Sequence, residues 1–163
     1  MIVKTFSKGG VHPPENKLTA ANPILSLPLP AKVFVPVHMN LGAPAKLLVE
    51  KGEAIKTGQL IAKGEAFISA NVHSPVTGKI VKIDEVTDHS GYRKMNVQIE
   101  TSADEWAEGI DTTSEIKRNC ELSPEKIISK INEMGVVGLG GATFPTHVKL
   151  MMPQGKKAEI LII

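Results

Sequence analysis

The chain has 163 residues, of which 42% are hydrophobic and 22% are charged, and its formal net charge is +2. This hydrophobic fraction is enough for a packed core, and the absence of basic runs mixed with aromatic residues argues against a nucleic-acid partner. The single cysteine, Cys120, excludes an internal disulfide framework and any four-cysteine metal or iron–sulfur site within these residues. No apolar run approaches the ~18 residues of a membrane-spanning helix.

Residues 1–30 are rich in proline, glycine and asparagine, as in "GGVHPPENKLTAANPILSLPLP". Proline fixes φ and removes a backbone donor, and it also disfavours a helical residue before it. This part is therefore predicted to be an extended N-terminal arm.

Residues 31–101 are predicted to form a small all-β domain. "KVFVPV" is rich in β-branched residues, but Pro36 makes it an edge strand or a bent strand. Glycines then punctuate short apolar runs, and "KMNVQIE" alternates apolar and polar residues cleanly. Short strands with glycine turns at this spacing favour a sandwich or barrel.

Residues 102–122 are polar and are predicted to be a linker, and a helix is expected to follow. Ser123 is a good N-cap, and Pro124 suits the first helical position. Gly135 is the residue type expected just past the helix end. One helical face collects the apolar side chains of Ile127, Ile128, Ile131 and Met134.

A glycine-rich loop comes next, in "GVVGLGGATFPTHVKL". A short helix is predicted from Pro145 or Thr146 to Leu150, and "KKAEILII" at residues 156–163 is predicted to be an apolar strand. A dinucleotide-binding fingerprint needs a preceding strand, whereas this loop follows a helix and has Thr143 in place of the third glycine. The Gly-Lys-Ser/Thr of a Walker A loop is also absent. On the residues alone, phosphate binding and a simple turn both stay open.

The stretch "VEKGEAIKTGQLIAKGEAF", followed by "HSPVTGKIVKI", resembles the biotinyl/lipoyl-type barrel-sandwich hybrid domains. In the prosthetic-group carriers of this class, an exposed hairpin carries the modified lysine. Here Phe67 and Ile68 stand where that lysine would lie, and the nearest lysine is Lys63. We therefore expect no biotin or lipoate, and a packing or docking role for the domain.

Two motifs resemble one family. "GLGGATFPTHVKL" is similar to the G-R-G-G-A-G-F-P-T-G-x-K-W loop of the flavin-binding subunit of respiratory complex I. It also resembles the corresponding loop of the C subunit (RnfC) of the Rnf electron transport complex, and "FSKGGVHPPENK" resembles the opening of RnfC. The order of arm, lysine-less barrel and glycine loop is the same. The resemblance implies a barrel-sandwich hybrid followed by the start of an α/β FMN/NADH-binding domain at residues 123–163.

The resemblance also implies a function. Rnf is a membrane-bound ferredoxin:NAD⁺ oxidoreductase coupled to ion transport, and RnfC is its peripheral component on the cytoplasmic side of the bacterial plasma membrane. The implied cofactors of the intact protein are FMN and NADH, with iron–sulfur clusters in a C-terminal region that is absent here. The implied partners are the other Rnf subunits, with ferredoxin or NADH as redox partners.

The glycine loop is the implied cofactor site. By resemblance, Lys149 contacts the flavin and Phe144 lies where the nicotinamide nucleotide stacks, while Thr143 and His147 replace glycines of the relatives. The implied cofactor-binding residues are Gly138, Gly140, Gly141, Ala142, Phe144, Thr146 and Lys149.

No catalytic residue and no metal site is expected, because the histidines lack metal-ligand spacing. The chain is expected to be an N-terminal portion of its parent and inactive alone. Two alternatives stay open. One is a non-catalytic docking module, and the other is the A subunit (NqrA) of the sodium-pumping NADH:quinone reductase, which has a similar layout.

Overall fold

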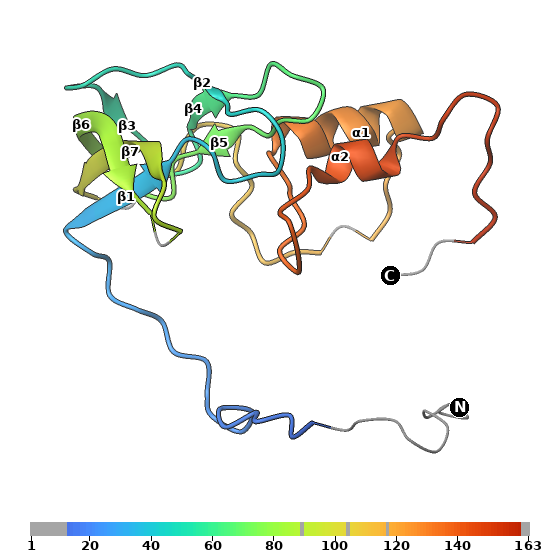
Figure 1. The fold of residues 1–163 in the computed structure, drawn as a ribbon, viewed down its shortest axis with the longest axis horizontal. Coiled ribbons are helices and arrows are strands. Elements are labelled where there is room, and N and C mark those ends of the chain that lie inside the picture. The colour runs from blue at the N-terminus through green and yellow to red at the C-terminus, as the bar shows by residue number, and fades with distance from the viewer. Residues whose placement is uncertain (1–12, 89, 104, 117, 161–163) are drawn as a thin grey trace.

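The computed structural model describes residues 13–160 except 89, 104 and 117. An extended arm comes first, strands lie between residues 32 and 101, and two helices follow, as Figure 1 shows. The elements are β1 (Lys32–Pro36), β2 (Lys46–Leu47), β3 (Ala54–Ile55), β4 (Leu60–Lys63), β5 (Val72–His73), β6 (Gly78–Thr87), β7 (Arg93–Thr101), α1 (Pro124–Glu133) and α2 (Thr146–Leu150).

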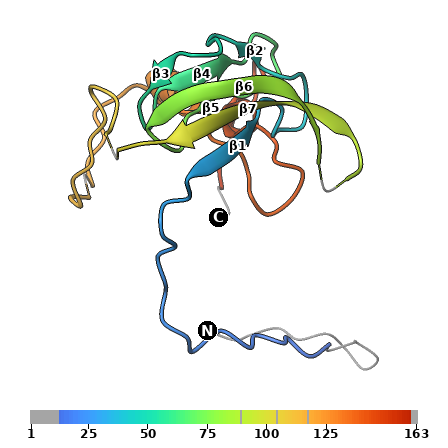
Figure 2. The same ribbon diagram turned by 90° about the vertical axis from the view of Figure 1, so that its left-hand side faces the viewer.

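The strands form two sheets around one core, as the sequence predicts for this region. One sheet has the order β1-β7-β6-β3 and the other the order β2-β4-β5 (Figure 2). Both sheets contribute side chains to a single buried cluster. Its most deeply buried members include Ile55, Ile61, Ala62, Ile80, Val97 and Ile99. Burial of these aliphatic side chains is the main force that holds the two sheets together.

The β6–β7 hairpin is the longest element of the fold and carries β1 on one side. Its register runs from Gly78 opposite Thr101 to Thr87 opposite Arg93. β1 pairs only with β7, so it is an edge strand, as Pro36 predicts.

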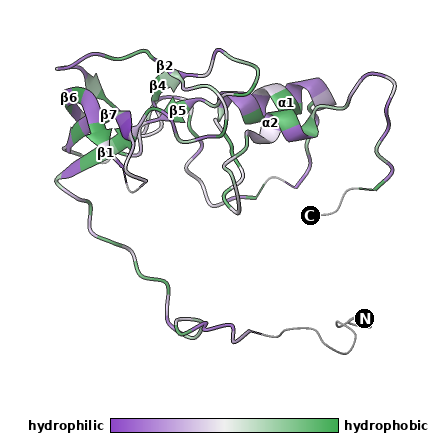
Figure 3. Cartoon of the chain, in the orientation of Figure 1, coloured by the Kyte–Doolittle hydropathy of each residue, from purple (hydrophilic) through white to green (hydrophobic). Residues whose placement is uncertain are grey.

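Helix α1 begins and ends where the sequence predicts. The Ser123 hydroxyl accepts a hydrogen bond from the Lys126 backbone N–H at 3.4 Å, and Gly135 has a φ of +66° just past the end. α1 packs against α2. No residue of α1 is buried, although the helix carries both hydrophilic and hydrophobic residues (Figure 3). Its apolar face is only half covered by the described residues.

The two ends of the described chain lie away from this body. Residues 13–30 are non-helical and exposed throughout, as predicted for the arm, whose first 12 residues lie outside the described range. The strand predicted at residues 156–163 is wrong for its described part, because residues 156–160 are irregular and Ile160 is 81% exposed. A strand needs a neighbour to pair its backbone groups, and no described strand lies beside this segment.

Candidate functional site

The glycine loop is a projecting turn closed at its base. Val137 and Pro145 form an isolated antiparallel bridge, and the Gly138 N–H donates to the Phe144 carbonyl at 3.1 Å. At the tip, Leu139 is 89% exposed. A Cβ added to Gly140 or Gly141 would meet no atom within 4 Å. The base is therefore fixed, while the backbone of the tip is open to a ligand.

Lys149, on α2, reaches back to the start of this loop. A Cβ on Gly138 would lie 2.4 Å from the Lys149 Nζ, so the ammonium occupies the space that a side chain would need. No carboxylate of the described residues forms an ion pair with Lys149. An unpaired ammonium beside an exposed glycine backbone suits an anion such as a phosphate.

The two residues expected to stand at glycine positions of the family loop, Thr143 and His147, have different surroundings. Thr143 has a φ of +52°, in the left-handed region that favours glycine, and its hydroxyl donates to the Ala142 carbonyl at 2.6 Å. Its own carbonyl accepts from the Leu41 N–H at 3.3 Å, which ties the loop to the barrel. His147 is only 4% exposed and contributes to the packing of α2.

The structure brings together some of the residues expected at the site. Gly138 and Lys149 are in contact, with Gly140, Gly141 and Ala142 at the adjoining tip. The other two residues stand at the base. Phe144 is half-buried with its carbonyl bonded to Gly138, and the Thr146 N–H donates to the Val136 carbonyl at 2.9 Å. Thr146 therefore has only its side chain left for a ligand.

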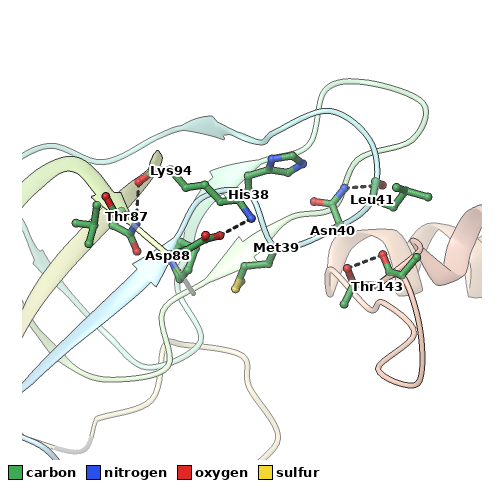
Figure 4. A pocket seen from close by; sticks show the side chains of 12 residues that line it. His38, Met39, Asn40, Leu41, Thr87, Asp88, Lys94 and Thr143 are labelled. Atoms are coloured by element: carbon green, nitrogen blue, oxygen red, sulfur yellow. Dashed lines mark hydrogen bonds and ion pairs between the residues drawn. The ribbon is translucent and has the colours of Figure 1, made fainter. Parts of the chain in front are cut away.

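A hollow of about 610 Å³ lies beside the loop, and no pattern in the sequence indicates it (Figure 4). It is lined by the segment after β1, by the end of the β6–β7 hairpin and by Ala142 and Thr143. Lys94 and Asp88 form an ion pair of 2.7 Å on its wall. The hydrogen bonds from Lys94 and then from Ser90 hold the pKa of Asp88 well below its usual range. Three segments far apart in the chain meet here, which a local sequence pattern does not reveal.

Residues 64–71, where the sequence predicts the counterpart of the carriers' hairpin, make contacts with both the barrel and α1. The Ile68 carbonyl accepts from the Ala43 N–H at 2.9 Å, which fixes the segment to the barrel. Asn71 Nδ2 donates to the Glu133 carbonyl at 3.0 Å, at the end of α1. A Cβ on Gly135 would lie 2.3 Å from the Asn71 carbonyl oxygen, so only glycine fits there. This segment therefore positions α1 and the glycine loop.

The described part of the chain shows no sign of a metal site or a membrane span. Residues 13–160, without the three gaps, contain no group of three or more His, Cys, Asp or Glu side chains that could hold a metal ion. No helix in that range is long and apolar enough to cross a membrane.

Similarity to known proteins identifies the family. Residues 4–104 match the family model described as the RnfC barrel sandwich hybrid domain. The chain is 45% identical, over 99% of its length, to the C subunit of the proton-translocating ferredoxin:NAD(+) oxidoreductase complex of Clostridium ljungdahlii. It is 36% identical, over 96% of its length, to the C subunit of the Na(+)-translocating ferredoxin:NAD(+) oxidoreductase complex of Acetobacterium woodii. To the C subunit of the ion-translocating oxidoreductase complex of Rhodobacter capsulatus it is 34% identical over 99% of its length.

The chain spans 35% of the length of the first two relatives and 31% of the third. The family match confirms the barrel-sandwich hybrid that the glycine spacing and the paired sheets indicate. The chain belongs to the RnfC family, the C subunits of the Rnf complex.

Proposed function

We propose that this chain is the N-terminal part of a peripheral component of a membrane-bound, ion-translocating ferredoxin:NAD⁺ oxidoreductase complex. The support is the family membership and the names of the relatives, which specify ferredoxin, NAD⁺ and ion translocation. The other subunits of such a complex are its partners, and its place is the cytoplasmic face of the membrane. The names of the relatives include ferredoxin, which favours this function over NqrA of the sodium-pumping NADH:quinone reductase.

In the intact protein, the glycine loop holds the phosphate of FMN. The observation that carries this proposal is the Lys149 ammonium, which lies against Gly138 beside an open backbone tip and forms no ion pair with a carboxylate of the described residues. At the tip, a Cβ added to Gly140 or Gly141 would meet no atom within 4 Å, and Gly140, Gly141 and Ala142 are all exposed. Successive backbone N–H groups in such a turn can bind an anion. Bound FMN supplies hydride exchange with a nicotinamide nucleotide and one-electron transfer to other centres. The chain's own part is to anchor the phosphate and to fix the loop base through Phe144 and Val136.

The 163-residue chain alone binds FMN weakly or not at all under this proposal. Its described residues after the barrel provide two helices and the loop, without the strands of an α/β domain. The relatives are about three times as long, which leaves room for the rest of the flavin site and for the cysteines of iron–sulfur clusters. Neither biotin nor lipoate is attached, since Phe67 and Ile68 stand at the carrier position; an intact mass above the sequence mass would show otherwise.

A docking module is the second candidate function. It is favoured by the segment 64–71, which makes a structural contact with α1 through Asn71 in place of carrying a prosthetic group. In that case the loop is only a turn, and the intact protein binds its flavin elsewhere.

Titration of the full-length protein with FMN separates the two. Lys149→Ala should weaken binding by ~1–3 kcal/mol, or roughly 5- to 150-fold, the range for hydrogen bonds to charged groups. Lys156→Ala is the matched control, because Lys156 is an exposed lysine in a turn beyond α2. Gly138→Ala should displace the ammonium and weaken binding as well, whereas Gly140→Ala meets open space and should not block the ammonium. Equal affinities in all four variants would support the docking module.

A further inference from the structure

The arm between residues 13 and 30 carries apolar side chains that nothing in the described structure covers. Every residue of this stretch is exposed, and its hydrogen bonds are local ones between residues 16 and 22. The arm leaves the body at β1 and runs apart from it in both views (Figures 1 and 2). The exposed fractions are 101% for Ile24, 81% for Leu25, 92% for Leu27 and 53% for Leu29.

The pattern of this segment is that of an extended strand with one usable edge. Leu25, Leu27 and Leu29 alternate with Ser26 and Pro28, so in an extended chain the leucines share one face. In such a chain, the N–H and C=O of each residue point to the same edge. The backbone groups of the even-numbered residues lie along one edge, where Pro28 and Pro30 have no N–H to donate. The backbone groups of the three leucines lie along the other edge, and each leucine there has its N–H donor.

The leucine edge is the same edge by which β1 pairs with its neighbour. The carbonyl of Ala31 accepts from the Thr101 N–H at 3.0 Å, and the Val37 N–H donates to the Met95 carbonyl at 2.9 Å. Odd-numbered residues of this strand thus face β7, which ends at Thr101. An extended arm would continue that edge beyond the end of β7, with its donors unpaired.

We infer that residues 24–29 dock as a one-edged strand onto the part of the intact protein that lies outside these 163 residues. The relatives are about three times as long as this chain, so the intact protein has ample further surface. The described body also leaves α1 without a buried residue, with Met134 52% exposed, so this body offers further apolar surface on which the rest of the intact protein can pack. The inference needs the intact protein, but it does not depend on flavin binding.

The composition of the arm argues against a lipid surface as its cover. No charged residue occurs between Leu18 and Ala31, whereas segments that lie on anionic membranes combine apolar side chains with lysine or arginine. Because Pro28 and Pro30 lie on one edge of the arm, a second strand cannot readily pair with that edge. The arm is therefore suited to pair through its other edge with one strand of the same protein.

Residue-resolved amide hydrogen exchange tests this inference. In the 163-residue chain, the amides of Leu25, Ser26, Leu27 and Leu29 should all exchange at rates close to those of an unfolded chain. In the full-length protein, purified without its partners, the three leucine amides should exchange at least about 100-fold more slowly, while Ser26 stays fast because it lies on the proline edge.

Two variants of the full-length protein complete the experiment. Leu25→Asp with Leu27→Asp should abolish protection at Leu29, whereas Ser26→Asp, on the opposite face, should leave it. FMN titration of the same preparations reports the flavin site separately. The inference is overturned if the leucine amides are unprotected in the full-length protein. It is equally overturned if protection depends on protein concentration, on lipid vesicles or on the other Rnf subunits, since the cover would then be a second copy, a membrane or a partner.

Discussion

At the scale of residues, the Lys149 ammonium stands where a side chain on Gly138 would have to lie. A side chain at this position would have to displace the lysine ammonium, whereas Gly140 and Gly141 face open space. The sequence motif gives these residues no distinct roles. In the structure, Gly138 leaves space for the ammonium of Lys149, and Gly140 and Gly141 form the open tip of the loop. Motif spacing could not show this, because it depends on how α2 folds back over the loop.

The contribution of the Asp88 side chain to stability should depend on pH. The hydrogen bond from Lys94, its ion-pair partner, is the largest cause of the lowered pKa of its carboxyl, and hydrogen bonds from Ser90 lower the pKa further. The pKa of an aspartate in an unfolded chain is about 3.9. A carboxyl whose pKa is lower than this in the folded state stabilises the fold fully above about pH 3.9, and this stabilisation is lost as the pH falls through the folded-state pKa. Asp88→Asn should therefore reduce stability at about pH 7, and the difference from wild type should shrink below about pH 4. Urea unfolding across this range measures it, and a difference that does not change with pH would contradict the pairing.

At the scale of elements, the barrel is held by aliphatic side chains from both sheets. Ile61, on β4, is fully buried, so Ile61→Ala should cost ~2–5 kcal/mol of unfolding free energy through lost burial and a residual cavity. Ile24→Ala makes the same chemical change in the fully exposed arm and should stay within about 0.5 kcal/mol. Urea denaturation of the 163-residue chain compares the two. Similar costs at both positions would mean that the arm is buried or the barrel is loosely packed.

Local signals explain which elements could be predicted. The ends of α1 follow from Ser123 and Gly135, and the edge position of β1 follows from Pro36, because caps and prolines act on their own neighbourhood. The bond from Asn71 to Glu133 joins residues far apart in the chain, and no local pattern contains it. The prediction of a strand at residues 156–163 is wrong for residues 156–160, because a strand also needs a neighbouring strand, and no described strand lies beside this segment.

At the scale of the whole molecule, the barrel holds the glycine loop in place. Segment 64–71 connects the barrel to α1, and Leu41 connects it to Thr143. Leu41 and Thr143 also line the hollow of about 610 Å³. The family and the barrel class could be predicted from the sequence, because the glycine spacing and the two long motifs are specific. The hollow could not be predicted, because segments far apart in the chain meet at it.

The central claim is that the loop anchors the phosphate of a flavin nucleotide. The most direct measurement is a parallel titration of the full-length protein and its Lys149→Ala variant with FMN and with riboflavin, which lacks the phosphate. We predict that the variant loses affinity for FMN by ~1–3 kcal/mol and keeps the wild-type affinity for riboflavin. An unchanged affinity for FMN, or an equal loss for both ligands, would contradict the assignment of Lys149 to the phosphate.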